Sequence, residues 1–486
     1  MDKSETRRSF LRSGTVAGLG LMAGGASVQS TLGADGAHTS AASADTKTSS
    51  PNPASSPNPD QAQSAEGYRY QPGPGGPLGS AGDRGRLIPG RRAPDRSLVP
   101  VQAPDLTKLP WEMKNGVKEF HLRAMQVRRE FLPGYEMVAW GYNGSVPGPT
   151  IEANQGDRVR IVVHNDLPEP HSVHWHGFEL PVAEDGVPGV TQDPIPPGGK
   201  YVYEFHLHQT GTYFYHSHIP MQESFGMVGF FIVHPKKAWE PVVDRDFCLI
   251  FQNFMIPPNQ TIPDSMAMDW NWHTINGRSG PYTTPLVCRH GERVRIRLLD
   301  FSPMQHHPVH IHGHTFWLTG AGGGRIPPEA WVPANITLTA VAQARVFEFV
   351  ANNPGDWLMH CHMVHHMMNH MVRQVGPRVR SYQDVSEFIQ SPDNRPPVRL
   401  AHADPGFNVP GYPQKMQGME MTEAAMEKLW NRREVQGMRH NWHMGVHGLM
   451  TVVRVLPDDL YDRVIHGQET IPRGAVFDEI VRRFSW

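Results

Sequence analysis

The chain has 486 residues, enough for two or three domains of ordinary size. Its 45 Lys and Arg nearly balance 47 Asp and Glu, so no electrostatic case exists for binding nucleic acid or an acidic membrane surface. Three cysteines exclude a scaffold built on disulfides. The 28 histidines and 23 methionines stand out, because both residue types bind soft or borderline metals.

The N-terminus carries an arginine pair, Arg7-Arg8, followed by a small, weakly apolar stretch over about residues 14–28. That stretch is too short and too rich in Gly to span a membrane as a lasting helix. We interpret residues 1–37 as an export signal of the twin-arginine type, a route that carries folded proteins. The predicted location is the periplasm or the medium outside the cell.

Residues 38–105 are rich in Pro, Ser, Ala and Gly and show almost no apolar periodicity. Such a segment buries too little surface to order itself, so we expect a disordered leader or a loosely draped arm. From about residue 110 the pattern changes to short runs that alternate apolar and polar residues, separated by tight Gly/Pro turns. This pattern predicts an all-β fold of sandwiches or barrels.

An internal repeat organises the β region. In each copy a Gly-acid-Arg-Val-Arg-Ile strand is followed by a histidine cluster and then by a Gly-led segment that ends in two histidines. The repeat predicts two tandem sandwiches, over 110–236 and 240–456. The matched features occupy residues 156–161, 171–176 and 211–218 in the first copy and 291–296, 307–312 and 355–362 in the second.

The second copy has a long tail. A strand predicted over 448–456 would complete its sandwich and make residues 377–445 an insertion, although a separate C-terminal tail is the alternative. Residues 457–486 form an extension with a partly helical pattern and no recognisable motif.

Four His-x-His pairs carry the chemistry. Side chains at i and i+2 of a strand point the same way, so each pair presents two imidazoles to one metal or to two adjacent metals. Their equivalent placement in two repeats predicts one shared polynuclear site, and imidazole suits copper, iron and zinc alike. The pairs are His174/His176, His216/His218, His310/His312 and His360/His362.

Cys361 lies between the histidines of the fourth pair and faces the opposite side of its strand. His366 follows five residues later, Met371 another five later, and His307 precedes the third pair. One thiolate, two imidazoles and a weak thioether are the ligands of a blue-copper electron-transfer site. These spacings argue against the alternative of an inert buried thiol.

Together these motifs resemble the four copper motifs of the multicopper oxidase family, which includes laccases. The resemblance covers about residues 110–376 and implies tandem cupredoxin-like Greek-key β-sandwiches. It also implies an oxidase that takes electrons singly from a donor and reduces dioxygen to water with four coppers: one type 1, one type 2 and two type 3.

The resemblance assigns ligands by position. His307, Cys361, His366 and Met371 match the type 1 ligands, and His174 and His310 match the type 2 ligands. Cys361 is bonded directly to both neighbouring histidines, which gives an electron at sulfur a short covalent path to the type 3 pair. The positions that match the type 3 ligands are His176, His216, His218, His312, His360 and His362.

Asp185 matches an acidic residue that the family places beside the trinuclear cluster. We predict that it is a catalytic residue that helps deliver protons to reduced oxygen. The alternative is an ordinary residue of an Asp-Gly turn.

The first repeat departs from the type 1 pattern. His171 occupies the place of His307, and Met227 aligns with Met371, but Ser217 replaces the cysteine. Gln222 replaces the second imidazole. We therefore expect type 1 copper in the second domain alone, which also argues against the two-domain nitrite reductases.

The short spacing between His216 and His307 leaves no room for a middle sandwich. The chain thus resembles two-domain oxidases, which form homotrimers. In those proteins the trinuclear cluster lies between domain 1 of one subunit and domain 2 of its neighbour.

The donor is the least determined part of the prediction. A laccase-like enzyme would oxidise phenols or aromatic amines, whereas a metallo-oxidase would take electrons from Cu(I) or Mn(II); a copper-free structural protein is a remote alternative. Electrons should enter at an exposed edge of His307 or His366. Methionines near the type 1 site and in the insertion either bind Cu(I) or fill apolar gaps. They are Met363, Met367, Met368, Met416, Met419, Met421, Met438 and Met444.

Cys248 and Cys288 both lie near the start of the second domain. In an exported protein they could pair as a disulfide, and two buried free thiols are the equal alternative.

Overall fold

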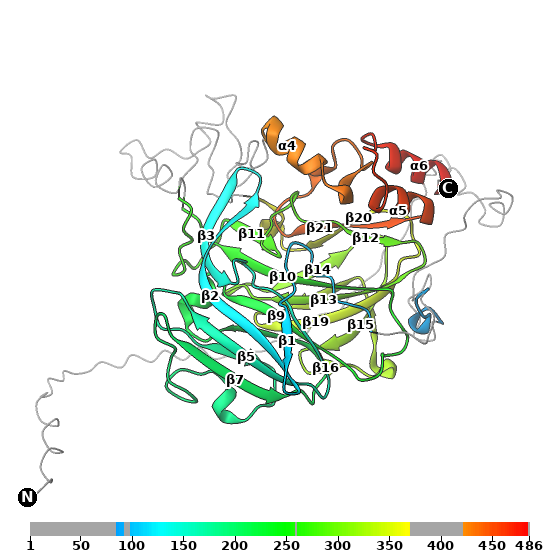
Figure 1. Ribbon diagram of the computed structural model, residues 1–486. Helices are drawn as coiled ribbons and strands as arrows, with labels where there is room; N and C mark the ends of the chain where they lie inside the picture. The colour runs from blue at the N-terminus through cyan, green and yellow to red at the C-terminus, as the bar shows by residue number, and fades with distance from the viewer. Residues whose placement is uncertain (1–83, 92–97, 258–259, 370–420, 485–486) are drawn as a thin grey trace, which may run out of the picture. The chain divides into compact units, whose positions relative to one another are not determined.

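The computed structural model describes residues 84–91, 98–257, 260–369 and 421–484, most of which lie in two strand-rich domains (Figure 1). Over those ranges, no helix has the length and apolar character needed to cross a membrane. Met371 and most of the predicted insertion lie outside the described residues.

Domain 1 packs a five-stranded sheet, β1-β2-β5-β7 with β3 paired to β2, against a four-stranded sheet, β4-β9-β8-β6. Apolar side chains from both sheets, such as Phe120, Trp175 and Phe231, fill the space between them. The strands are β1 (Trp111–Lys114), β2 (Val117–Leu132), β3 (Tyr135–Tyr142), β4 (Ile151–Asn154), β5 (Arg158–Asn165), β6 (Val173–His176), β7 (Lys200–His206), β8 (Gly211–Ser217) and β9 (Val228–His234). The helical turns are η4 (Val182–Glu184) and α1 (Pro220–Ser224).

Domain 2 has the same two-layer plan, with a seven-stranded sheet, β11-β10-β13-β19-β15-β16 plus β17 on β15, and a five-stranded sheet, β12-β21-β20-β14-β18. Phe247, Phe316 and Met359 belong to the core between these sheets. The strands are β10 (Arg245–Phe254), β11 (Trp272–Ile275), β12 (Leu286–Arg289), β13 (Arg293–Asp300), β14 (His307–Ile311), β15 (Phe316–Ala321), β16 (Gly324–Arg325), β17 (Val332–Ala334), β18 (Ile336–Thr339), β19 (Gln343–Val350), β20 (Gly355–Cys361) and β21 (Met450–Leu456).

Short helices surround the second domain. They are η3 (Arg84–Leu87), η5 (Pro328–Ala330), η6 (Val364–Met367), α4 (Glu423–Trp430), η7 (Arg433–Val435), η8 (Trp442–Gly445), α5 (Asp458–Ile465) and α6 (Ala475–Phe484). The last two account for the helical pattern after residue 457, and they pack Leu460, Val464 and Ile480 against Val287 of β12.

The sequence repeat is also a repeat of strand pairing. The parallel pair β2–β5 of domain 1 corresponds to β10–β13 of domain 2, and the parallel pair β4–β9 corresponds to β12–β21. In the same way β8, with His216, corresponds to β20, with His360. The two sandwiches confirm the predicted all-β tandem fold, and β21 takes in domain 2 the place that β9 has in domain 1.

Two apolar clusters join the domains. One combines Phe214 and Phe230 of domain 1 with Ile250 and Phe301 of domain 2. The other places Phe131 of domain 1 against side chains of domain 2 that include Trp272 and Leu429. The loops at the ends of β8 and β13 are thereby fixed next to each other.

The end of the predicted leader is ordered. The expectation of disorder up to residue 105 is therefore wrong for the described parts of the leader, residues 84–91 and 98–105. Gln102 donates its N–H to Asp246, and Cys248 donates its N–H back to Gln102. Val101 is buried. Composition alone missed these backbone hydrogen bonds, because a segment without its own apolar period can still pair with the edge of a formed sheet.

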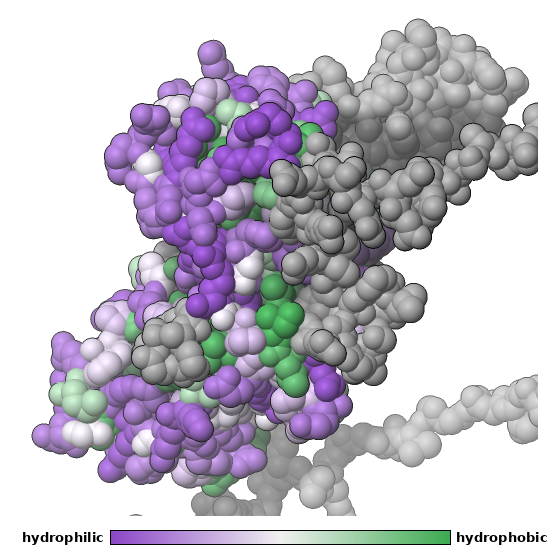
Figure 2. All heavy atoms as spheres, turned by 90° about the vertical axis from the view of Figure 1, so that its right-hand side faces the viewer, coloured by the Kyte–Doolittle hydropathy of each residue, from purple (hydrophilic) through white to green (hydrophobic). Residues whose placement is uncertain are grey.

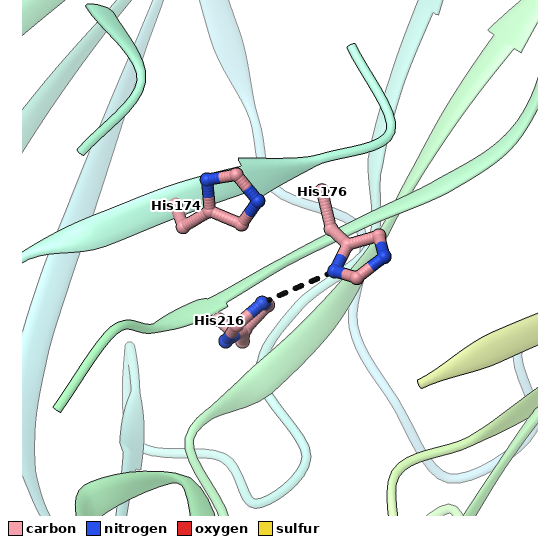
Figure 3. Close-up of side chains that lie close together, drawn as sticks. All are labelled: His174, His176 and His216. Carbon is pink, nitrogen blue, oxygen red and sulfur yellow. Dashed lines mark hydrogen bonds between the residues drawn. The ribbon is translucent and has the colours of Figure 1, made fainter. Parts of the chain in front are cut away.

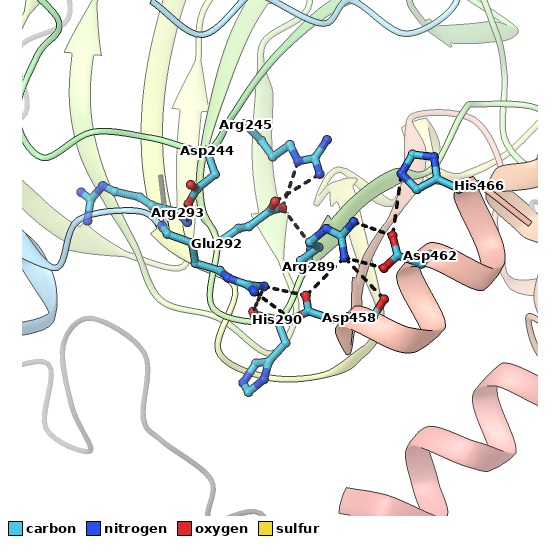
Figure 4. Close-up of polar contacts among 10 residues, drawn as sticks. Asp244, Arg245, Arg289, His290, Glu292, Arg293, Asp458, Asp462 and His466 are labelled. Carbon is cyan, nitrogen blue, oxygen red and sulfur yellow. Dashed lines mark hydrogen bonds and ion pairs between the residues drawn. The ribbon is translucent and has the colours of Figure 1, made fainter. Parts of the chain in front are cut away.

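A charged cluster fastens the C-terminal helices to the second sandwich (Figure 4). Arg289 pairs with Asp458 and Asp462 of α5, and Glu292 accepts hydrogen bonds from Arg245. Arg91 of the N-terminal segment also pairs with Asp458. The face turned to the viewer in Figure 2 is mostly hydrophilic, with apolar side chains in smaller patches between polar ones.

Cys248 and Cys288 are free and buried, in agreement with the thiol alternative. They belong to two separate apolar clusters, and burial raises the pKa of both thiols well above the ordinary range.

Candidate metal centre

The eight paired histidines form two quartets on neighbouring strands. In domain 1, β6 and β8 run antiparallel and place His174 directly opposite His216. In domain 2, β14 and β20 place His310 directly opposite His360. Each quartet therefore gathers two sequence-distant pairs at one end of a sheet.

In domain 1 the ligand nitrogens of His174, His176 and His216 all lie within 4.8 Å of one another (Figure 3). His218 completes the group, with its ring centroid 5.3 Å from that of His174. Asp185 lies beside it, because a carboxylate oxygen is 3.4 Å from Nδ1 of His174. The predicted acidic residue is thus adjacent to the histidines, where its proposed role in proton delivery stays a prediction.

In domain 2, Nε2 of His312 and Nε2 of His360 are 3.1 Å apart, and the ring centroids of His310 and His362 lie 5.7 Å and 5.4 Å from that of His360. His312 and His362 are exposed at the surface of the chain. Across the described residues, the contacts between one quartet histidine ring and another occur within each quartet and not between the two quartets.

Backbone carbonyls orient four of these rings. Nδ1 of His174 donates to Asp185 at 2.8 Å, and Nδ1 of His216 donates to Ser217 at 2.7 Å. Nδ1 of His310 donates to the backbone oxygen of Asn335 at 2.6 Å, and Nδ1 of His360 donates to the backbone oxygen of Cys361 at 2.8 Å. Fixing the proton on Nδ1 leaves Nε2 as the metal-binding atom, the usual arrangement around a histidine ligand.

Burial keeps several of these imidazoles neutral without metal. Burial, together with the smaller effect of neighbouring histidines, lowers the pKa of His176 to about 4 and that of His216 to about 3. Burial likewise lowers the pKa of His360, and partial desolvation together with the neighbouring His310 and His362 lowers that of the more exposed His312. A neutral imidazole is the form that binds metal, so no proton has to leave at neutral pH.

A second, smaller centre lies on the other side of β20. Sγ of Cys361 is 3.5 Å from Nδ1 of His307 and 3.4 Å from Nδ1 of His366, and the two nitrogens are 3.1 Å apart. A point in their plane ~1.9 Å from all three atoms exists at these separations, close to metal–nitrogen and metal–sulfur bonds of about 2.0–2.3 Å. These three residues therefore fit a trigonal copper site.

Burial raises the pKa of the Cys361 thiol to about 12 and lowers that of His366 to about 4. The metal-free site is thus a neutral thiol with neutral imidazoles. A bound cation reverses this preference at sulfur, because metal coordination deprotonates a thiol.

Sequence reasoning missed three polar residues around this centre. Ser302 contacts Nε2 of His307 through its hydroxyl at 2.7 Å, and Asp300 lies behind it, 3.6 Å from the same nitrogen. Burial raises the pKa of Asp300 to about 8. His273, from β11, packs its ring 4.7 Å from that of His366. None belongs to a spaced motif, so the fold alone could reveal them.

The expectation of an exposed imidazole edge is wrong, because His307 is 0% and His366 is 2% exposed. Phe251 packs edge-on against His307, and Leu449 donates its N–H to the backbone of His366. An electron donor on the surface must therefore reach these rings through an intervening residue.

At the corresponding place in domain 1, three side chains hydrogen-bond to one another. Oε1 of Gln222 lies 2.8 Å from both Nδ1 of His171 and the Ser217 hydroxyl and accepts from each. Nε2 of His171 is 3.4 Å from the Tyr142 hydroxyl. Every polar group of this buried set has a partner, and the absence of type 1 copper from domain 1 stays a prediction.

Two sandwiches, two histidine quartets and one Cys–His₂ centre define a copper-binding protein of the multidomain β-sandwich class. Two multicopper oxidase domain profiles match residues 124–238 and 255–380. The chain belongs to the multicopper oxidase family, whose members are copper oxidoreductases, and the resemblance seen in its motifs is confirmed.

Individual relatives match parts of the chain. Laccase-1 of Cryptococcus neoformans var. neoformans is 50% identical over 226 residues, 39% of this chain and 35% of the relative. Copper resistance protein A of Escherichia coli is 38% identical over 274 residues, 46% of this chain and 44% of the relative. The matches thus span less than half the length of these curated relatives. A solved blue copper oxidase from Nitrosomonas europaea has 28% identity and a TM-score of 0.49, covering 52% of this chain and 81% of that one.

Proposed function

We propose that this protein oxidises a donor one electron at a time and reduces dioxygen to water. One observation carries the proposal: Cys361 lies between His360 and His362 on one strand, with its sulfur facing His307 and His366. A single residue thereby connects a mononuclear centre with a histidine quartet through covalent bonds.

Copper held by His307, Cys361 and His366 supplies one-electron transfer, and three coppers held by the eight paired histidines supply dioxygen reduction. The chain itself keeps these imidazoles neutral and oriented, and it encloses the sulfur in an apolar core. Asp185 has the position to hold a proton beside the dioxygen-reducing site.

The experiment is oxygen uptake by the copper-loaded full chain with a phenol, Cu(I) and Mn(II) as donors. We expect four electrons from the donor for each dioxygen consumed, with water as the product. Uptake that produces hydrogen peroxide, or no uptake with any donor, would contradict the proposal. The laccase relatives favour phenols or aromatic amines, and a cavity lined by the exposed methionines Met221, Met266, Met268 and Met304 favours a metal ion as second candidate.

We further propose that the trinuclear site is shared between subunits of a homotrimer. The exposure of His312 and His362, together with separate ring contacts within each quartet, supports a site that a second chain completes. Analytical ultracentrifugation of the active protein checks this proposal. A monomer with full activity would contradict it.

Export in the folded state is the corresponding proposal for location. The arginine pair Arg7-Arg8 and the weakly apolar stretch after it support a twin-arginine signal. Replacing both residues with Lys should retain the protein inside the cell, and unchanged export of that variant would contradict the proposal.

A further inference from the structure

Two histidines lie together on the outer face of domain 1. His121 belongs to β2 and His164 to β5, which are neighbouring parallel strands (Figure 1). The residues before them, Phe120 and Val163, belong to the core, so both imidazoles point out of the sandwich. The quartet of domain 1 comes from β6 and β8 of the other sheet, so the His121–His164 pair is separate from the copper centres.

The two imidazoles face each other at a distance that suits one shared metal ion. Nδ1 of His121 is 3.4 Å from Nε2 of His164, and the ring planes are inclined by 21°. Two nitrogens on one tetrahedral ion, each with a bond of about 2.0–2.1 Å, are ~3.3 Å apart. The observed separation is longer than a typical hydrogen bond of an N–H group, about 2.7–3.2 Å. The pair therefore fits a bridging ion better than a direct hydrogen bond.

A carboxylate orients the first of these rings. Oε1 of Glu119 lies 3.1 Å from Nε2 of His121, and an ionised carboxylate only accepts, so Nε2 of the ring carries the proton. The lone pair of Nδ1 is then directed at His164. Ion pairs with Lys114 and Arg160 hold Glu119 in place. A carboxylate that accepts from the distal N–H is the usual support of a histidine ligand.

A surface pocket of about 620 Å³ opens over the His121–His164 pair. Its lining includes Met125, whose thioether is a further weak ligand, and the pocket has room for water to complete a coordination shell. Arg123, also in the lining, pairs with Asp166, which offsets its positive charge. The pocket is thus accessible to a hydrated cation.

The corresponding face of domain 2 is apolar. The strand pair β2–β5 corresponds to β10–β13, and aligning the two registers places Cys248 at the position of His121. The same alignment places Leu299 at the position of His164. Cys248 and Leu299 both belong to the apolar cluster that joins the domains. The fold itself therefore does not require polar side chains at these positions, and the two imidazoles need an explanation of their own.

We propose that His121 and His164 bind one borderline divalent cation, Cu(II) or Zn(II), on the outer face of domain 1. Imidazole is a ligand for both ions. On binding, His164 moves its proton from Nε2 to Nδ1, so both facing nitrogens bind through lone pairs and the pair loses no proton. The ion connects β2 to β5 and stabilises the folded sheet, because an unfolded chain does not hold the two rings together.

The test measures Zn(II) binding to the copper-loaded full chain by calorimetry and metal analysis. Zn(II) is colourless, so the visible absorption of the Cys361 centre verifies that each protein is folded and loaded. The variants are His121→Asn, His164→Asn and the double variant. The matched control is His208→Asn/His466→Asn, which removes one histidine from each domain. Their side chains are 57% and 63% exposed, against 55% for His121.

We expect the double variant to bind one Zn(II) fewer per chain than the parent, and the control to bind like the parent. Each single variant should lose at least about tenfold in affinity, nearly as much as the double variant, because a chelate needs both ligands. Zn(II) should raise the melting temperature of the parent and the control more than that of the double variant. Equal Zn(II) binding by the parent and the double variant overturns the inference. Losses of the single variants that add up to that of the double variant also overturn it, because they indicate two independent histidines.

Competition between cations tests the proposed ligands. We expect Cu(II) to displace Zn(II) from the parent, since Cu(II) binds nitrogen ligands more tightly. Ca(II) prefers oxygen ligands and should leave bound Zn(II) in place. Displacement by Ca(II) would assign the ion to carboxylates and overturn the proposed imidazole site. Oxygen uptake should be the same in all variants, because the pair lies outside the copper centres, and its loss in the double variant would contradict a separate site.

Discussion

The same place in the two sandwiches holds two different centres. In domain 1, Ser217, Gln222 and His171 form a closed hydrogen-bond set in which the Gln oxygen accepts from both partners. In domain 2, Cys361 and two imidazoles leave a gap that fits a metal. The strands around the two places correspond, so side-chain chemistry decides whether the place binds copper.

Under the proposed function, this difference would confine electron entry to domain 2. Hydroxyl and amide groups satisfy each other inside a protein, whereas a cysteine sulfur and two neutral imidazoles offer electron pairs that can bind a soft cation. We therefore expect two sequence differences, Ser217 against Cys361 and Gln222 against His366, to separate a structural site from a redox site.

Removing the sulfur of domain 2 should have the largest effect. We expect Cys361→Ser to abolish the intense visible absorption and to lower oxygen uptake by more than about 100-fold. This loss exceeds the one expected when a residue that only hydrogen-bonds to a metal ligand is removed, because Cys361 is itself a ligand. Absorption and oxygen-electrode measurements check this expectation. Ser217→Ala, the matched change in domain 1, should keep both properties, and a Cys361→Ser protein that stays active would refute the proposed electron route.

Converting domain 1 should add a centre. Ser217→Cys/Gln222→His places a thiol and an imidazole beside His171, the set found in domain 2. We expect one more copper per chain and stronger visible absorption, measured by metal analysis and spectroscopy. If a folded double variant bound no additional copper, residues other than these two would also be needed for copper binding at this place.

Breaking the hydrogen bonds of domain 1 should affect stability and spare the copper. Gln222→Ala leaves Nδ1 of His171 and the Ser217 hydroxyl buried without their acceptor. We expect the free energy of unfolding to fall by about 1–3 kcal/mol, the cost of stranding a buried polar group. Urea denaturation measures this loss. A Gln222→Ala protein as stable as the parent would contradict the account.

Acid should weaken domain 1 by a smaller amount. Burial lowers the pKa of His171 from its ordinary value of 6.5 to about 4. The unfolded chain therefore binds more protons between these values, and the stabilising contribution is complete above pH 6.5 and lost as the pH falls toward 4. We expect the stability difference between the parent and His171→Gln to decrease over that range. A difference independent of pH would show that His171 does not titrate there.

Much of this comparison could be predicted from the sequence, because the repeat aligned Ser217 with Cys361 and Gln222 with His366. The His-x-His spacing on strands also predicted the histidine quartets, because side chains at i and i+2 lie on the same face of a strand. Ser302, His273 and the cavity methionines could not be predicted, because loops distant in the sequence bring them together. The packed end of the leader was missed because its order depends on pairing with β10.

One strand pairing sets the moment at which the copper centre can form. Cys361 donates its N–H to Leu449, and Leu449 donates its own to His366, so both ligands are held by the segment that begins β21. This segment is synthesised well after β20, and chains emerge from their N-terminus. An incomplete chain cannot hold these ligands in place. We therefore expect the capture of copper by this centre to wait until the segment that begins β21 is in place.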